Sequence, residues 1–256
     1  MEARRIGAYG GTFDPIHRGH VEVAQVVLDK FEIDELLIIP AARPPHKDPR
    51  DLSGSHHRFA MAAIATLPMR GVRVSDIEIE TPAKPFTFET VARLRSYYGS
   101  GAELYFIIGS DSFEELHTWR RPDLILSNCN LIVAARPGYE ISDAALDRLA
   151  VIIKPGGEPF GKNEMVNEKE VESDDSVQPA GIIDLRGSGK AENGSIEGRP
   201  SGLIFLTDYI RADVSSTEIR RQAARDMNIE GMVPRGVAEY IRKYELYKPA
   251  GRLKTQ

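Results

Sequence analysis

Short apolar segments alternate with segments of helical periodicity through the first 135 residues, and this alternation constrains the fold more than any other feature. Four apolar runs have the length and composition of buried strands, over residues 6–9, 36–39, 104–108 and 131–135. Strands that alternate with helices are joined by right-handed crossovers and lie parallel in one sheet. We therefore expect an α/β fold with a doubly wound, mostly parallel sheet.

The segments between these runs predict helices with one apolar face each. The expected faces are Val21, Ala24, Val27, Leu28 and Phe31 in the first helix, Phe59, Ala63, Ile64 and Leu67 in the second, and Phe88, Val91, Leu94 and Tyr98 in the third. Imperfect alternation over 72–79 predicts another strand. After residue 200, we expect a strand over 203–206 and helices that begin near Ser216 and Pro234.

Residues 155–200 interrupt this pattern. Gly, Glu, Asn, Ser and Asp dominate there, and no aromatic residue follows Phe160 within the segment. A segment of this composition buries too little apolar area to offset the entropy that it loses on ordering. We predict a single domain over residues 1–256 with a flexible insertion over 155–200, in which only 182–185 has the composition of a short strand.

The composition is that of an ordinary globular chain. Of the 256 residues, 41% are hydrophobic and 28% are charged, and the net charge of −5 provides no basic field for a nucleic acid. Apolar runs are too short to cross a bilayer, and no signal-peptide core follows the first residues. The single cysteine, Cys129, lies in an apolar run, where a buried free thiol is expected. These features favour a cytoplasmic protein.

The segment GGTFDPIHRGH, which begins at Gly10, is the first candidate binding site. It follows the first predicted strand, and ligands of open parallel sheets bind beyond the carboxyl ends of strands. Gly10 and Gly11 allow the backbone to approach a ligand closely. Gly19 opens a helix whose free amide groups attract anions. His17 and His20 stand three residues apart, so both imidazoles can reach one phosphoryl group at the helix N-terminus.

A second candidate is the segment DVSSTEIRRQ near the C-terminal end of the sequence. Ser215 and Glu218 fit a capping box at the start of a helix, and such a cap would by itself explain these two residues. Arg220 lies in the first turns, where a cation opposes the helix dipole unless an anion lies between it and the backbone amides. Together with Ser216 and Thr217, the segment predicts a second phosphate site.

Two further segments follow predicted strands. ARPPHKD, after the second strand, provides Arg43, His46 and Lys47 as phosphate contacts at the same sheet edge. GSDSFEELHTW, after the third strand, places Asp111 where acidic residues of such sheets accept hydrogen bonds from a sugar or a base, although a helix N-cap is an alternative role. Trp119 is the only tryptophan, and packing into the core is the simplest explanation for it.

Other kinds of site fit the sequence less well. The P-loop pattern GxxxxGK[ST] and the nucleophile pattern GxSxG are both absent. His17 and His20 could share a metal ion, but no cysteine or carboxylate is spaced to complete a metal site. Asp14 is followed by Pro15, which indicates a turn.

These motifs resemble the two signatures of the nucleotidyltransferase superfamily, His-x-Gly-His in GGTFDPIHRGH and Ser-Ser-Thr-x-Ile-Arg in VSSTEIR. More narrowly, the chain resembles bacterial nicotinate-nucleotide adenylyltransferases in four further motifs, which are PPHK, PFTFET, GSDSFEELHTW and VPRGVAEYIRKYELY. The resemblance covers residues 5–140 and 203–247 approximately. Ser110 replaces an expected alanine, Phe86 stands where tyrosine is common, and the insertion is outside the usual pattern.

The resemblance implies a Rossmann-like nucleotidyltransferase fold with C-terminal helices, and a reaction of NAD biosynthesis. In that reaction, a 5′-phosphate oxygen of nicotinate mononucleotide attacks the α-phosphorus of ATP and pyrophosphate leaves. Catalysis would then consist of positioning and charge stabilisation. Mg²⁺ would arrive with ATP, without a metal site formed by the protein.

The resemblance also implies a role for each site residue. The catalytic residues would be His17, His20, Lys47 and Arg220. The ATP site would comprise Gly10, Gly11, Thr12, Phe13, Gly19, Asp111, Ser215, Ser216 and Thr217, and the acceptor site would comprise His46, Thr87 and Trp119. No nucleic-acid or membrane partner is implied, and a homo-oligomer is an open alternative.

Three alternatives stay open at this point. A sister adenylyltransferase would use nicotinamide mononucleotide or phosphopantetheine, although the phosphopantetheine enzymes usually have threonine at the position of His17. A relative of class I aminoacyl-tRNA synthetases would share the His-x-Gly-His motif, but the chain lacks a KMSKS-like loop. A nucleotide-binding regulatory module would keep the fold without turnover.

Overall fold

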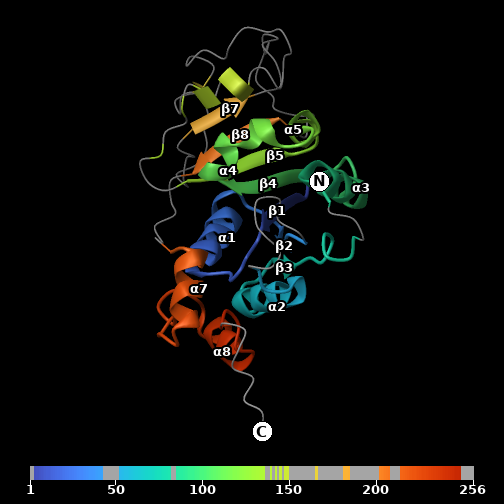
Figure 1. Cartoon of the computed structure of the whole chain (residues 1–256). Coiled ribbons are helices and arrows are strands. Elements are labelled where there is room, and N and C mark those ends of the chain that lie inside the picture. Colours follow the sequence, from blue (N-terminus) through green and yellow to red (C-terminus); the bar gives the residue numbers. More distant parts are fainter. Residues whose placement is uncertain are drawn as a thin grey trace, which may run out of the picture.

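The computed structural model describes residues 3–42, 52–81, 85–135, 139, 142, 144–145, 147–149, 165–166, 181–184, 202–207 and 214–248. Across these residues, one sheet runs through the molecule with the strand order β3-β2-β1-β4-β5-β8-β7-β6 (Figure 1). Its strands are β1 (Arg5–Gly11), β2 (Glu35–Pro40), β3 (Val72–Val74), β4 (Glu103–Gly109), β5 (Asn130–Ala134), β6 (Met165–Val166), β7 (Gly181–Asp184) and β8 (Leu203–Thr207).

Helices cover both faces of this sheet. They are α1 (Arg18–Lys30), α2 (Ser55–Thr66), α3 (Thr87–Tyr98), α4 (Ser110–Glu114), the 3₁₀ helix η2 (Leu116–Thr118), α5 (Pro122–Asn128), α7 (Ser216–Ala224) and α8 (Arg235–Lys243). On one face, α3 and α5 bury Val91 and Ile125 against the strands. On the other, α1, α2 and α7 bury Val27, Met61 and Ile219. The predicted doubly wound fold is therefore confirmed.

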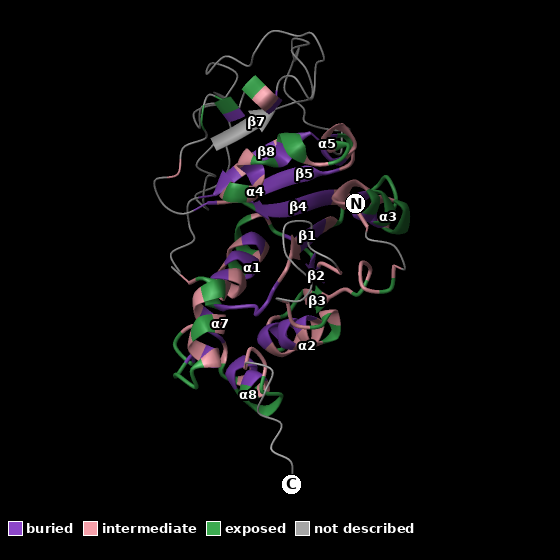
Figure 2. Ribbon diagram, viewed as in Figure 1, coloured by how far each residue is buried: buried purple, intermediate pink, exposed green. Residues whose placement is uncertain are grey.

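Every pairing among β3, β2, β1, β4, β5 and β8 is parallel, whereas β7 pairs antiparallel with β8 and β6 with β7. Since both faces are covered, the central strands are buried almost throughout, and Figure 2 shows burial concentrated there. All six residues of β2 are buried. This is the reason that these strands read as continuous apolar runs rather than as an alternating pattern.

The apolar face predicted for the second helix is only partly confirmed, because Ile64 packs against the core but none of the four predicted residues is among the fully buried ones. Helix α2 buries Arg58, Met61, Ala62, Ala65 and Thr66. The predicted face was one position further along, and its last member, Leu67, lies beyond the end of the helix with 85% of its surface exposed. The helix turns its polar Arg58 inward, so a pattern of apolar residues alone misplaces the buried side.

The strand predicted over 72–79 is also shorter than expected, because β3 ends at Val74. The residues that follow form turns, with hydrogen bonds of 2.9 Å from the Glu80 amide to the Asp76 carbonyl and of 3.3 Å from the Thr81 amide to the Glu78 carbonyl. Ile77 packs against the core from this turn, which accounts for its apolar character. Cys129 is buried with a free thiol, as predicted.

Most of the predicted insertion over 155–200 lies outside the described residues. The described parts are β6 and β7, and β7 confirms the strand that was expected near 182–185. A single domain over 1–256 and a flexible insertion stay predictions. Among the described helices, none has both the length and the apolar character needed to cross a membrane.

Candidate active site

The candidate site lies where the strand order reverses, between β1 and β4. From β1 the chain moves outward to β2 and β3 on one side and then returns to β4 on the other. Open α/β sheets bind ligands beyond the carboxyl ends of the strands at such a point. Tyr9 of β1 is in register with Ile107 of β4, so the two strands end side by side. The GGTFDPIHRGH and GSDSFEELHTW segments, which follow these strands, are thus brought to one edge of the sheet.

The paired glycines at the end of β1 make room for aromatic rings. A Cβ atom on Gly11 would lie 2.8 Å from the ring of Phe13, and one on Gly10 would lie 3.1 Å from the ring of Phe106. Phe13 has a positive φ of 51° and a buried ring, which meets the His20 ring edge-on at a centroid distance of 5.0 Å. These glycines therefore have a packing role in addition to the close approach to a ligand that was expected of them.

His17 and His20 form a stacked pair at the N-terminus of α1. His17 is the N-cap residue, and the two imidazole rings lie 3.7 Å apart between centroids with an angle of 26° between their planes. The backbone N–H of His17 donates to Nδ1 of His20 over 3.2 Å. Because Nδ1 of His20 is thus an acceptor, the neutral ring carries its proton on Nε2. The backbone therefore selects the tautomer that can donate from the far side of the ring.

Burial keeps His17 neutral. Only 8% of its surface is exposed, and this burial lowers the pKa of His17 to about 4. Its Nδ1 atom is buried and makes no hydrogen bond within the described part of the chain. The same part contains no group of three or more His, Cys, Asp or Glu residues arranged to hold a metal ion. A neutral imidazole has one N–H donor, so a histidine pair at a helix N-terminus is able to donate hydrogen bonds to a phosphoryl oxygen.

Helix α7 docks its N-terminus on the loop between β1 and α1. The hydroxyl of Ser216 donates to the Pro15 carbonyl over 3.1 Å, and Nη1 of Arg220 donates to the Asp14 carbonyl over 2.8 Å. Nη2 of Arg220 donates to the hydroxyl of Thr217 over 3.2 Å. The two segments predicted to bind phosphate, about 200 residues apart in the sequence, are therefore joined directly.

The expected capping box of Ser215 and Glu218 is wrong. Ser215 does occupy the N-cap position of α7, but its side chain makes no capping hydrogen bond. The Glu218 carboxylate instead pairs with Arg221 at 2.8 Å and accepts a hydrogen bond of 2.8 Å from Gln222. A charged partner one turn along the helix outcompetes the backbone amide for this carboxylate.

Asp14 holds the turn that was expected from Asp14–Pro15, whose peptide bond is cis. Asp14 is buried, with only 1% of its surface exposed. Oδ1 accepts a hydrogen bond of 2.8 Å from the Tyr247 hydroxyl, and Oδ2 accepts one of 3.1 Å from the Ser53 amide. Asp14 therefore connects the loop with two distant segments, a role that its position in the sequence does not reveal.

The segments predicted to bind the acceptor also meet. Thr87 is the first residue of α3, directly after Phe86, and Trp119 follows η2, directly before Arg120. The guanidinium of Arg120 lies over the Phe86 ring at 4.7 Å from its centroid. Trp119 is half-buried and packs against the core of that face, so core packing accounts for part of its role.

Asp111 lies at the second position of α4 with an exposed side chain. The N-cap of that helix is Gly109, so the alternative role of Asp111 as an N-cap is wrong. Gly19 lies buried in the first turn of α1. Arg43, His46 and Lys47 lie outside the described residues.

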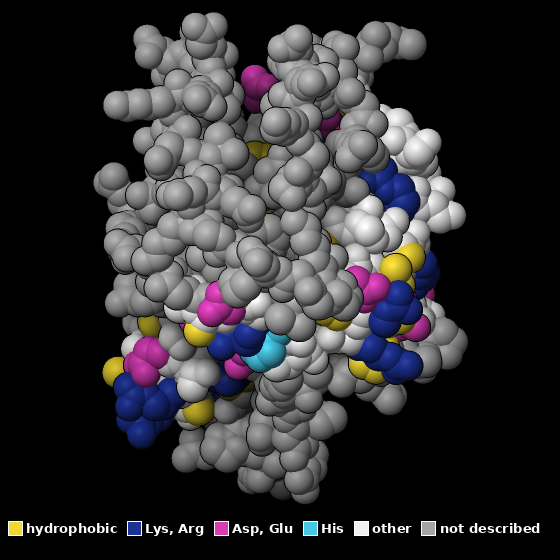
Figure 3. All heavy atoms as spheres, turned by 90° about the horizontal axis from the view of Figure 1, so that it is seen from above, with side chains coloured by type: hydrophobic (Ala, Val, Ile, Leu, Met, Phe, Trp, Pro, Cys, Tyr) yellow, Lys and Arg dark blue, Asp and Glu magenta, His cyan; other side chains and the backbone are white. Residues whose placement is uncertain are grey.

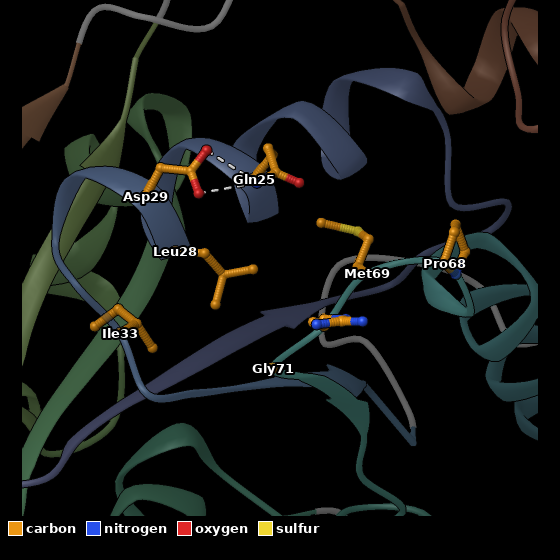
Figure 4. Close-up of a pocket in the computed structure, with 8 residues that line it drawn as sticks. Gln25, Leu28, Asp29, Ile33, Pro68, Met69 and Gly71 are labelled. Carbon is orange, nitrogen blue, oxygen red and sulfur yellow. Dashed lines mark hydrogen bonds between the residues drawn. The ribbon is translucent and has the colours of Figure 1, made fainter.

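A hollow of about 630 Å³ lies beyond the amino ends of the strands, at the opposite end from the candidate site (Figure 4). Its walls come from the C-terminal half of α1 and from the segment that enters β3, including Leu28, Met69 and Gly71. Gln25 and Asp29, which also line it, are hydrogen-bonded to each other over 2.9 and 3.0 Å. Because this hollow lies at the amino ends of the strands, it is separate from the candidate site.

The described surface carries charges of both signs. In the face shown in Figure 3, Lys and Arg side chains lie beside Asp and Glu side chains at both margins of the view.

Comparison with protein families matches residues 8–222 to the cytidylyltransferase-like family. Among curated relatives, a probable nicotinate-nucleotide adenylyltransferase of Pelobacter propionicus is 34% identical over 245 residues, which cover 95% of this chain and 98% of the relative. A probable nicotinate-nucleotide adenylyltransferase of Thermoanaerobacter sp. is 32% identical over 244 residues, which cover 95% and 94%.

Among solved structures, the chain is similar to Plasmodium falciparum nicotinic acid mononucleotide adenylyltransferase complexed with NaAD. The TM-score is 0.64 at 18% sequence identity, over 95% of this chain and 97% of the other. The same Plasmodium enzyme complexed with APC matches with a TM-score of 0.60. At this identity the likeness establishes the fold, which agrees with the strand order and helix layers described above.

Proposed function

Since this chain belongs to the nicotinate-nucleotide adenylyltransferases of the cytidylyltransferase-like family, we propose that it transfers the adenylyl group of ATP to nicotinate mononucleotide. The chain is a nucleotidyltransferase of NAD biosynthesis. A 5′-phosphate oxygen of the mononucleotide forms a bond to the α-phosphorus of ATP. The bond from that phosphorus to the bridging oxygen of the β-phosphate breaks, and the products are deamido-NAD and pyrophosphate.

The observation that supports this assignment of roles is the docking of α7 on the Asp14–Pro15 turn, which leads to the histidine pair at the point where the strand order reverses. In the proposed mechanism, His20 donates from Nε2 to an oxygen of the α-phosphate, where negative charge grows in the transition state. His17 stacks on His20 and fixes its orientation. Since neither ring needs to change its protonation state, the pair acts by stabilising charge rather than as a general base.

Helix α7 is proposed to hold the β- and γ-phosphates. Its first backbone amides lack partners within the helix, and the positive end of its dipole attracts anions. Ser216 and Arg220 fix this helix end to the Asp14–Pro15 turn, which keeps it beside the histidine pair. Ser215 and Thr217 are exposed on the same turn, where their hydroxyls can reach the triphosphate.

Mg²⁺ is proposed to enter as part of the substrate MgATP. The described residues offer no cluster of acidic or histidine side chains for a resident ion. Phosphate oxygens and water are the ligands that Mg²⁺ prefers, so the triphosphate can hold the ion by itself. The ion would neutralise charge on the leaving pyrophosphate.

The acceptor is proposed to lie against Thr87 and Trp119, with the nicotinate ring stacked on the indole. The contact between Phe86 and Arg120 supports this placement, because it brings the two segments together. Gly10–Phe13 would line the nucleotide site, and Asp111 would face the adenosine. The proposed contacts of His46 and Lys47 with phosphate rest on the family pattern alone, since both residues lie outside the described part.

We further propose that the enzyme works in the cytoplasm, which the buried free thiol of Cys129 supports. Assembly into a homo-oligomer stays a prediction. The function is tested by measuring pyrophosphate release from ATP and Mg²⁺ with three acceptors. Nicotinate mononucleotide should react fastest. Equal or faster release with nicotinamide mononucleotide or phosphopantetheine would overturn the acceptor assignment, and ATP binding without release would favour a regulatory module.

A further inference from the structure

Arg58 of α2 is a buried arginine whose guanidinium binds three backbone carbonyls. Only 1% of the residue is exposed. Nη1 donates to the Thr12 carbonyl over 2.9 Å, Nη2 donates to the Ala42 carbonyl over 3.2 Å, and Nε donates to the Ser53 carbonyl over 3.1 Å. One rigid, planar group therefore joins the loop after β1, at Thr12, to the connection between β2 and α2, at Ala42 and Ser53.

Two of these carbonyls belong to the two sides of the proposed site. Thr12 follows β1 and lies in the loop that leads to the histidine pair. Ala42 follows β2, the neighbouring parallel strand, whose last residue, Pro40, is in register with Gly11. Beyond the strands, one further backbone bond joins these loops, from the Ala41 amide to the Gly11 carbonyl over 2.8 Å. Arg58 thus continues the β1–β2 pairing past the end of the sheet.

The same connection reaches α3, which begins at the proposed acceptor residue Thr87. Burial raises the pKa of Glu78, and the nearby Ala42 backbone and Arg58 guanidinium oppose that shift, so the Glu78 carboxylate lies close to both. Oε1 of Glu78 also accepts a hydrogen bond of 2.9 Å from the hydroxyl of Thr90, a buried residue in the first turns of α3. Thr12, Arg58, Ala42, Glu78 and Thr90 therefore form one continuous path from the ATP side to the acceptor side.

Two carboxylates balance the charge of Arg58. Burial lowers the pKa of Arg58, and the negative charges of Asp14 and Glu78 oppose that shift. A buried charge costs free energy that a well-packed apolar side chain would not, so a buried arginine is weak evidence for stability as such. Arg58 supplies directional hydrogen bonds to three carbonyls of two loops at once, which an apolar residue of similar volume cannot provide.

We propose that Arg58 is a positioning residue for adenylyl transfer, which sets the ATP loop at Thr12 at a fixed distance from the acceptor side at Ala42 and α3. The proposal rests on the proposed function and adds a residue that does not touch either substrate. Each substrate is bound mainly by its own loop, so loss of Arg58 leaves the binding of ATP alone intact. The relative placement of the two substrates changes, and a shift of about 1 Å in such a geometry can reduce turnover about 100-fold.

Arg95 of α3 provides a matched control. Its guanidinium also binds three carbonyls, those of Gly99, Ala102 and Asn128, over distances of 2.6 to 3.2 Å. These carbonyls precede β4 and β5, at the edge of the sheet away from the candidate site. Arg95→Lys therefore makes a comparable change in bonding without altering the loops of the site.

The experiment compares wild type, Arg58→Lys and Arg95→Lys in three measurements. These are thermal unfolding, calorimetric ATP binding with its stoichiometry, and kcat at saturating ATP and nicotinate mononucleotide. We expect Arg58→Lys to bind ATP with unchanged stoichiometry and affinity within about threefold, while kcat falls at least about tenfold. Arg95→Lys should keep kcat within about twofold even where its Tm falls. A purely structural role for Arg58 would lower the ATP-binding stoichiometry in step with kcat.

A kcat of Arg58→Lys that equals that of Arg95→Lys, in protein that binds ATP normally, overturns the proposal. Failure of the wild type to turn over any acceptor would instead overturn the proposed function, so the two failures are distinguishable. If Arg58→Lys does not fold, Glu78→Gln is the deciding variant. It keeps the shape of the side chain and removes the charge beside Arg58, and it should lower kcat about threefold or more without weakening ATP binding; an unchanged kcat overturns the proposal.

Discussion

The hydroxyl of Tyr247 donates a hydrogen bond of 2.8 Å to Oδ1 of Asp14, which joins the end of the described chain to the loop after the first strand. Asp14 is buried, and a carboxylate removed from water is costly unless donors surround it. The C-terminal motif VPRGVAEYIRKYELY ends at Tyr247 and so gains a structural role. It supplies a hydrogen-bond donor to Asp14 in the loop between β1 and α1.

Tyr247→Phe is expected to lower the free energy of unfolding by about 1–3 kcal/mol, because one buried carboxylate oxygen loses its donor. Urea denaturation of the two proteins measures the difference. Tyr244→Phe serves as the control, since Tyr244 is 50% exposed and its loss should change stability by less than about 0.5 kcal/mol. Equal stability of wild type and Tyr247→Phe would show that the hydrogen bond contributes nothing net.

His20→Ala is expected to bind ATP but to lose about 10²–10³-fold in kcat, since the donor proposed for the α-phosphate is gone. Steady-state pyrophosphate release, together with ATP binding by calorimetry, separates the two effects. His56→Ala is the control, because His56 is exposed on α2 and has no role in the proposed site. Turnover near the wild-type level in His20→Ala would eliminate the role assigned to this histidine.

The stability of the protein should fall as the pH is lowered from about 6.5 towards about 4, partly because of His17. In the native state its pKa is about 4, lowered by burial, whereas the unfolded chain has the ordinary value of 6.5. Between these values the unfolded state binds a proton that the native state does not. The stabilisation by neutral His17 is therefore complete above pH 6.5 and is lost on acidification, by about 3 kcal/mol at most.

The test is a comparison of denaturant unfolding at several pH values for wild type and His17→Gln. Glutamine does not titrate, so the variant should show a shallower loss of stability between pH 6.5 and 4. Parallel curves for the two proteins would mean that His17 is not held in its neutral form by the fold.

The parallel sheet could be predicted from the sequence because its strands are buried on both faces and appear as short, continuous apolar runs. The buried face of α2 could not. Arg58 would count as an exposed residue in any hydrophobic pattern, and it is buried because Thr12 and Ala42 present carbonyls to it. Those residues lie 46 and 16 positions away, beyond the range of a periodicity argument.

The candidate site was predictable to the extent that its residues occur in short motifs. The motifs identify His17, His20, Ser216 and Arg220 as candidate phosphate-binding residues. The docking of α7 on the β1–α1 loop brings the two motifs together, which agrees with a shared phosphate site. Side-chain partners were harder to predict, because several acceptors and donors compete for each group. The bond between Asp14 and Tyr247 spans 233 residues and carries no local signal.

Gly11→Ala is expected to lower both stability and turnover. The new Cβ would lie 2.8 Å from the buried ring of Phe13, and that ring contacts His20. Overpacking of this kind costs about 1–3 kcal/mol, and displacement of Phe13 would disturb the histidine pair, so kcat should fall as well. Denaturant unfolding and pyrophosphate release measure the two effects. Gly101→Ala is the control, since no atom lies within 4 Å of its added Cβ and stability should change by less than about 0.5 kcal/mol. If Gly11→Ala were as stable and as active as Gly101→Ala, Phe13 would have to move without cost, and the packing role of Gly11 would be refuted.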